Sequence, residues 1–293
     1  IAYTMRDIST HAPAYYHRDT SMTKLYDNLQ HIRSKAIRDV TQSRYVTINS
    51  QALEDFAHQH VKPRNKVYAL PVIVKRLPPE DQLGIALIFG AINYCFVDPD
   101  TGTDYAYTSK TLRMTRSSGL LHALASSGLN WRNFTDISIV PQARWREILH
   151  LDEADVVLFD EKERLRRLTS FSAYLSKRLT DTSMFFERHS VNDIYNLLQE
   201  SGLFEDTFSK RLQIVLIWLS EIAESQSATF DFDVTALTAA ADYRLPQVMC
   251  HLGIIRLNEG ASSQLNDKIT DFQFENDMRA AAIAVCYRVA VIT

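Results

Sequence analysis

The sequence predicts a mainly α-helical protein with one small β-hairpin, and three observations indicate this fold class. Gly and Pro number only 8 each in 293 residues, which favours long helices over many tight turns. Apolar residues recur at helical spacing in most segments, and alternating residues between turn signals occur only within 96–116. With 46% hydrophobic residues and no obvious linker, we expect a single compact domain over 1–293, in which 1–42 form an N-terminal extension and the first helix.

The first half of the chain is expected to contain three helices and the hairpin. Apolar spacing predicts a helix over 21–41, and Ser50 is expected to cap a second helix, "SQALEDFAHQH". Pro78 and Pro79 begin a third helix that continues to about residue 95. It is apolar on nearly every side, so we expect it at the centre of the protein. In the hairpin, "DPDTG" and "TSK" are turn signals beside the alternating "DYAYT" and "TLRMT".

The second half is expected to be helical throughout. Ser190 and Asp233 are expected to cap two of its helices, and Pro246 is expected to interrupt the second because the residue before a proline is disfavoured in the α region. The predicted helices lie near 117–127, 141–150, 160–179, 190–200, 209–224, 234–241, 246–256 and 275–290.

Composition restricts the function classes. The 32 basic and 35 acidic residues give a net charge of -3, so no overall basic field favours a stable nucleic-acid complex. The three cysteines are odd in number and lie in apolar runs, which is typical of buried thiols in a reducing compartment. "IAYTMRDIST" has no apolar core, and the longest apolar runs are too short or too interrupted for a membrane span. We therefore expect a cytoplasmic protein with no membrane partner.

Familiar cofactor and metal motifs are missing. The sequence has no Gly-rich phosphate loop, no Ser-centred nucleophile elbow and no zinc spacing. His58 and His60 are two positions apart, and on a helix such side chains diverge by about 200°. We therefore expect no cofactor and no metal.

Three places could carry chemistry, and the residues alone leave each of them open. Asp242 lies in "AADYRLPQVMCHLG". It either has a structural role, capping the helix that starts near Pro246 or pairing with Arg244, or faces a ligand across small alanines. Lys210 begins an apolar helix. It is either an ordinary surface lysine or a point charge that binds a phosphate. Asn93 and Phe96 belong to a core stripe or contact a base.

At these residues the sequence resembles the queuosine salvage family of queuosine 5'-phosphate N-glycosylases. The strongest match is "ADYRLPQVMCHLGIIRL" at 241–257. Weaker matches follow the same order along the chain: "SRYVTI" (43–48), "IFGAINYCFV" (88–97), "SSGLLHALASSGL" (117–129), "DEKERLRRL" (160–168), "FSKRLQIV" (208–215) and "DMRAAAI" (277–283).

The resemblance implies a helical fold similar to that of helical DNA glycosylases and a metal-independent hydrolase. Such an enzyme releases queuine and ribose 5-phosphate from queuosine 5'-monophosphate, for reuse of queuine in tRNA modification. We expect it to act as a monomer on this small nucleotide. Carried over by position, Asp242 is the catalytic carboxylate and Lys210 binds the 5'-phosphate. The other implied substrate-binding residues are Asn93 and Phe96 near the base, Tyr243, Arg244, Asp277 (a glutamate in most of the family) and Arg279. Arg244 and Gln247 are also expected to hold the turn that orients Asp242.

Some positions depart from the family pattern. Val97 replaces an aromatic residue, and an aromatic pair is missing around Ser118. The alternatives are therefore a catalytically silent module that binds a modified nucleotide or tRNA, and a divergent glycosylase for another nucleotide. The acidic net charge disfavours a DNA glycosylase.

Overall fold

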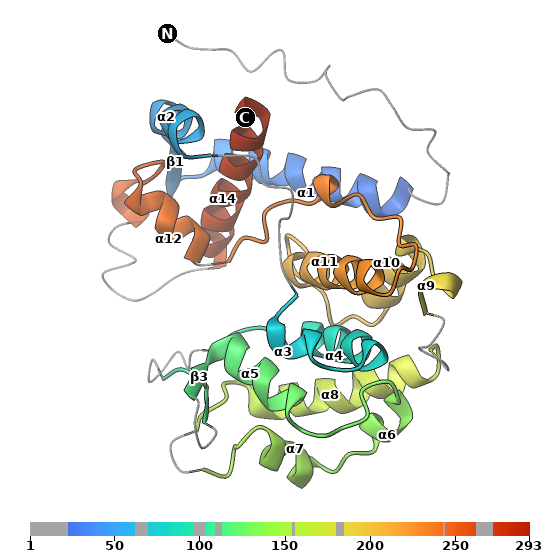
Figure 1. The fold of residues 1–293 in the computed structure, drawn as a ribbon. Helices are drawn as coiled ribbons and strands as arrows, with labels where there is room; N and C mark the ends of the chain where they lie inside the picture. The colour runs from blue at the N-terminus through green and yellow to red at the C-terminus, as the bar shows by residue number, and fades with distance from the viewer. Residues whose placement is uncertain are drawn as a thin grey trace.

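Helices dominate the computed structural model, as the sequence predicts (Figure 1). The structure describes residues 23–61, 70–96, 103–108, 113–153, 156–179, 185–242, 244–261 and 272–293. No helix in these ranges is long and apolar enough to cross a bilayer.

The elements follow one another along the chain in this order: α1 (Thr23–Gln42), β1 (Val46–Ile48), α2 (Ser50–His60), α3 (Val72–Lys75), α4 (Pro79–Ile92), β2 (Ala106–Thr108), β3 (Arg113–Thr115), α5 (Arg116–Ala125), α6 (Phe134–Ser138), α7 (Gln142–Ile148), α8 (Glu161–Ser176), α9 (Phe185–Arg188), α10 (Val191–Glu200), α11 (Lys210–Ser225), η2 (Val234–Ala236), α12 (Arg244–His251), β4 (Ile255–Leu257) and α14 (Phe272–Ile292). Most predicted helices are confirmed with ends shifted by a few residues. The short α3, α6 and α9 were not predicted.

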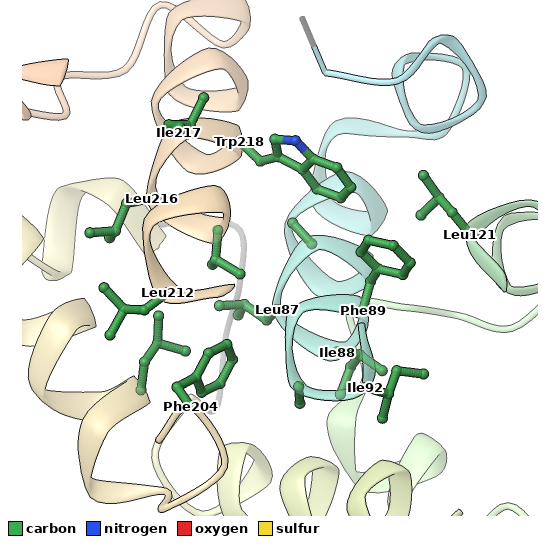
Figure 2. Packing of buried hydrophobic residues seen from close by; sticks show 14 of the residues in the cluster. Leu87, Ile88, Phe89, Ile92, Leu121, Phe204, Leu212, Leu216, Ile217 and Trp218 are labelled. Carbon is green, nitrogen blue, oxygen red and sulfur yellow. The ribbon is translucent and has the colours of Figure 1, made fainter. Parts of the chain in front are cut away.

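Helices α4 and α11 pack against each other at the centre (Figure 2). Every residue of α4 from Gln82 to Ile92 is buried, which confirms the central position expected from its apolar surface. Phe89 stacks on Trp218 of α11 with ring centroids 5.3 Å apart. A Cβ atom at Gly90 would lie only 2.2 Å from Val215 Cγ2, so this glycine permits the close approach of the two helices.

The two ends of the described chain come together in the upper part of Figure 1, where α1 packs along α14. Beside them β1 pairs antiparallel with β4, with Thr47 opposite Arg256. This sheet differs from the sequence prediction, in which 246–256 form one helix. Gly253, with a φ of 68°, ends that helical segment in the left-handed region that glycine tolerates. The chain then continues as a strand.

The predicted hairpin is confirmed: β2 pairs antiparallel with β3, with Tyr107 opposite Met114. Its turn signals, 98–102 and 109–110, lie outside the described residues. A Cβ atom at Gly119 would lie 2.7 Å from the carbonyl oxygen of Met114, so α5 packs closely on the hairpin.

Three further sequence predictions are wrong in detail. Asn49 caps α2 in place of Ser50, since its side chain accepts the N–H of Ala52. Asp233 does cap a helical turn, but that turn is only η2, and residues 237–242 are not helical. Cys95 is exposed, although all three cysteines are free as expected.

Candidate active site

Asp242 lies at the entrance of α12 and caps it. The backbone N–H of Arg244 donates to Asp242 Oδ1 at 2.9 Å. The helix already begins at Arg244, so the predicted break at Pro246 is wrong. Pro246 occupies the first turn, where backbone N–H groups have no partner within the helix, so its missing N–H costs nothing. The interpretation of Asp242 as a cap is confirmed, and it uses one of the two carboxylate oxygens.

The other oxygen of Asp242 faces Lys210, the first residue of α11. Lys210 Nζ donates to Asp242 Oδ2 at 3.1 Å, and the two side chains are 26% and 34% exposed. Burial alone would raise the pKa of Asp242, but Lys210 and the N–H groups of Arg244 and Leu245 outweigh it and hold the pKa below its ordinary value. The structure therefore presents an ionised, half-exposed carboxylate next to an ammonium group.

Asp206 joins the segments that carry these two residues, and sequence reasoning missed it. One oxygen, Oδ2, accepts the backbone N–H of Lys210 at 2.8 Å. Both oxygens accept Nη2 of Arg279 from α14, at 2.7 and 2.9 Å. Arg279 Nε in turn donates to the carbonyl of Ala241 at 3.1 Å. An aspartate four positions before a helix start was a signal for the contact with Lys210, but nothing local indicated the partner on α14.

The non-helical segment before Asp242 is also hydrogen-bonded to α11. Gln213, which is fully buried, accepts the N–H of Thr238 at 2.8 Å and donates to the Thr238 hydroxyl at 2.9 Å. The same amide donates to the Phe208 carbonyl at 3.0 Å. These contacts explain why "TAAAD" is not helical despite its helix-favouring alanines, and they fix the approach of the chain to Asp242.

A second cluster holds the loop that follows α4 and carries Asn93 and Phe96, both half-buried. Arg211, the neighbour of Lys210, donates to the Ala91 carbonyl at 3.0 Å. Arg164 of α8 is fully buried and donates to the carbonyls of Ile92, Tyr94, Cys95 and Phe159. The first turn of α11 therefore contacts two places. Arg211 contacts the end of α4 and Tyr94 in the loop after it, and Lys210 contacts Asp242.

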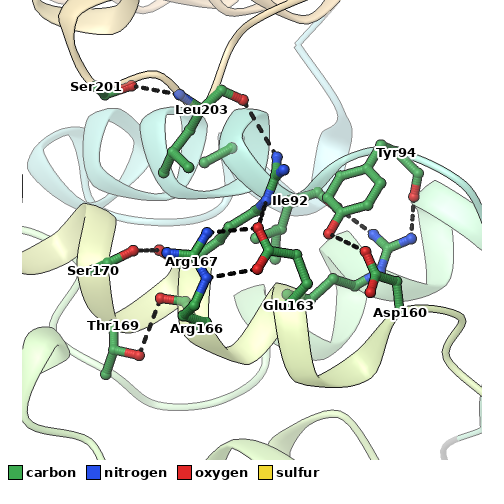
Figure 3. Close-up of polar contacts among 12 residues, drawn as sticks. Ile92, Tyr94, Asp160, Glu163, Arg166, Arg167, Thr169, Ser170, Ser201 and Leu203 are labelled. Carbon is green, nitrogen blue, oxygen red and sulfur yellow. Dashed lines mark hydrogen bonds and ion pairs between the residues drawn. The ribbon is translucent and has the colours of Figure 1, made fainter.

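Tyr94 lies among three guanidinium groups in this cluster, and Figure 3 shows its phenol beside Asp160. The groups of Arg164, Arg167 and Arg211 lie 4.1, 4.7 and 5.4 Å from its ring centroid. Burial raises the pKa of Tyr94 to about 12, although Arg164 and Arg167 oppose the shift, so the phenol stays neutral and donates to Asp160 Oδ2 at 3.2 Å. Burial likewise lowers the pKa of Arg164 to about 10, which leaves it charged at neutral pH.

The remaining predicted site residues fall in different places. Asp277 is 1% exposed and accepts hydrogen bonds from Ser43 and, at 2.6 Å, from Gln273. The contact with Ser43 joins α14 to the segment after α1. Arg244 is exposed at the start of α12. Tyr243 and Val97 lie outside the described residues. The structure thus groups Asp242, Lys210 and Arg279 around Asp206, with the Asn93–Phe96 loop beside them.

Comparisons with known proteins show which family the chain resembles. A family model described as "Queuosine salvage protein" matches residues 78–292, a range that contains Asp206, Lys210, Asp242 and Arg279. A curated queuosine 5'-phosphate N-glycosylase/hydrolase of Sphaerobacter thermophilus is 28% identical over 185 residues. That alignment covers 58% of this chain and 56% of the relative, so the match spans little more than half the length of that protein.

Proposed function

The chain belongs to the queuosine salvage protein family, and on this premise we propose that it hydrolyses the N-glycosidic bond of queuosine 5'-monophosphate. The products are queuine and ribose 5-phosphate. The observation that carries the proposal is the Asp242 carboxylate, kept ionised by Lys210 and by the first amides of α12. The name of the Sphaerobacter relative supports the same reaction and substrate.

The chemistry of the bond requires such a carboxylate. As C1' separates from the base nitrogen, positive charge develops on the sugar, and a fixed negative charge beneath C1' stabilises that transition state. Asp242 either attacks C1' or activates water there, following the general logic of glycoside hydrolysis. In both routes water supplies the hydroxyl group on C1' and the proton on the departing nitrogen.

Lys210 is our candidate for the 5'-phosphate. Its ammonium group lies within hydrogen-bond distance of Asp242, so one side chain can hold the carboxylate ionised and face a phosphate bound next to it. A contact to a remote phosphate supplies binding energy that orients C1' toward the carboxylate. The other proposed substrate contacts come from Asn93, Phe96, Tyr243 and Arg244. We also propose that the protein is a single-domain, cytoplasmic monomer.

The test is release of queuine from queuosine 5'-monophosphate, measured by chromatography, with binding followed by calorimetry. We expect the wild type to release queuine and Asp242→Asn to bind the nucleotide but to lose at least about 10³-fold in kcat. Asparagine can still accept the Arg244 N–H, so the fold should persist.

Asp233→Asn is the matched control. Asp233 also caps a helical turn through its carboxylate, by accepting the N–H of Thr235, and the same change there should leave the activity unaltered. A folded wild-type protein that binds the nucleotide without releasing its base would overturn the hydrolase and leave the silent binding module. Turnover of a different nucleotide only would establish the divergent glycosylase.

A further inference from the structure

We propose that Asp206 and Arg279 are positioning residues that act as a pair and hold the Asp242 carboxylate at a fixed place relative to Lys210. The inference rests on the proposed hydrolase function and assigns Arg279 a role other than substrate contact. Neither residue needs to touch the nucleotide for this role.

The pair connects three segments that are distant in sequence. Arg279 comes from α14, Asp206 precedes α11, and Ala241 precedes α12. Asp206 accepts Nη2 of Arg279 on both oxygens, and Arg279 Nε donates to the carbonyl of Ala241. The residue after Ala241 is Asp242, so the guanidinium group holds the backbone from which the carboxylate projects.

Asp206 acts on the other member of the site at the same time. Its Oδ2 accepts the backbone N–H of Lys210 at 2.8 Å. One carboxylate therefore orders the first residue of α11 and, through Arg279, the residue before Asp242. Lys210 and Asp242 in turn contact each other at 3.1 Å. The four residues and the Ala241 carbonyl therefore form a closed ring of contacts.

The exposure and charge of the pair fit a positioning role better than a ligand role. Arg279 and Asp206 are 13% and 14% exposed, which is about half the exposure of Lys210 and Asp242. The guanidinium lies 5.2 Å from the ring centroid of Phe208, and Asp206 balances its charge. Asp206 also occupies the N–H of Lys210, where a substrate anion would otherwise bind the helix N-terminus. The Nζ group of Lys210, by contrast, donates to Asp242.

A planar guanidinium is required because the two contacts differ in direction. Nη2 and Nε bind different acceptors from one rigid group. A lysine could pair with Asp206 as a point charge, but it would not hold the Ala241 carbonyl in the same geometry. A displacement of about 1 Å in a catalytic group can cost roughly 10²-fold in rate.

The test compares Arg279→Ala, Arg279→Lys and Asp206→Asn with the wild type in the queuine-release assay. We expect kcat to fall about 10- to 100-fold in Arg279→Ala and in Asp206→Asn, less in Arg279→Lys, and KM to change by less than about threefold. The double variant should lose little more than either single variant, because both remove one pair. Added guanidinium should restore part of the kcat of Arg279→Ala.

A second readout does not depend on turnover. The rate of Lys210 acetylation, followed by peptide mass spectrometry, should rise severalfold in Arg279→Ala as the contact with Asp242 loosens, while Lys24 acetylation stays constant. Arg146→Ala is the matched control, since Arg146 forms ion pairs with Asp152 and Glu161 away from this site. It should change neither measurement.

A rise in KM with unchanged kcat in Arg279→Ala would indicate that Arg279 binds the substrate and would overturn the proposal. Unchanged kcat and unchanged Lys210 acetylation in Arg279→Ala would also overturn it. If Arg279→Ala does not fold, Arg279→Lys carries the test, with intermediate values expected in both measurements. An inactive wild type whose Lys210 acetylation still responds to Arg279→Ala would refute the hydrolase function and leave the positioning geometry supported.

Discussion

Replacing Arg164 with Met should destabilise the protein strongly and should also weaken substrate binding. Arg164 is fully buried and donates to four backbone carbonyls, of which one is in the last residue of α4 and two are in the loop after it. Its guanidinium also lies 4.1 Å from the Tyr94 ring centroid and 4.9 Å from that of Phe96. Methionine has a similar length, so it fills much of the space but satisfies none of the carbonyls.

The magnitude follows from two opposing contributions. Hydrogen bonds to a charged group contribute about 1.5–3 kcal/mol each, whereas removing a buried charge recovers several kcal/mol of desolvation cost. The four lost bonds outweigh that recovery, and we expect the free energy of unfolding to fall by about 3 kcal/mol, in line with broken buried ion contacts. At 2–4 °C per kcal/mol for domains somewhat smaller than this chain, Tm should fall by roughly 6–12 °C.

Two assays check the Arg164 prediction. Urea unfolding gives the change in stability, and queuine release gives KM and kcat. Because the loop carries Asn93 and Phe96, KM should rise more than kcat falls. Arg166→Met is the matched control on the same helix: Arg166 is exposed and pairs with Glu163, so its loss should change little. Stability of Arg164→Met within 1 kcal/mol of the wild type would refute the account of the loop.

Two other predictions concern the ionisation of Asp242 and the packing of α4. The proposed hydrolysis uses Asp242 in its ionised form, so we expect activity to be lost as pH falls through the pKa of this carboxyl. Since Lys210 lowers that pKa, Lys210→Met should move the acidic limb of the kcat/KM profile to higher pH, and an unmoved limb would contradict the ion pair. Gly90→Ala places a Cβ atom 2.2 Å from Val215 Cγ2 and should cost about 1–3 kcal/mol in urea unfolding. Wild-type stability would show that the two helices can separate freely.

The helices were predictable because their signals are local. Apolar residues three and four positions apart define α1 and α11, and the all-apolar surface of α4 indicated its central position. Strand β4 was not predictable in the same way. It is three residues long and exists through its pairing with β1, more than 200 residues earlier in the chain. The predicted helix over 234–241 is wrong for a related reason. The alanines favour a helix locally, but Gln213 on α11 binds Thr238 and stabilises a non-helical conformation.

In the candidate site too, local features could be predicted from the sequence and contacts between distant residues could not. Pattern alone left Asp242 open between a cap, which the structure confirms, and a group that faces a ligand, and it placed Lys210 at a helix start. Only the family resemblance indicated that both belong to one site, and the contact between them spans 32 residues of sequence. Asp206 and its partner Arg279 are 73 residues apart. No local rule links two such positions, so the pair became visible only in three dimensions.

The capping role of Asp242 is a physical reason for placing the proposed catalytic carboxylate at this position. Capping engages Oδ1 with the first amide of α12, which fixes the rotation of the carboxylate and directs Oδ2 toward Lys210. The amides at a helix start carry partial positive charge, so the cap favours the ionised form as well as the orientation. A carboxylate on the middle of a helix would need other side chains for both effects. Asp242→Asn keeps the orientation and removes the charge, whereas Asp242→Ala removes both. The Ala variant should therefore be less stable than the Asn variant by about 1 kcal/mol, although the two should be equally inactive.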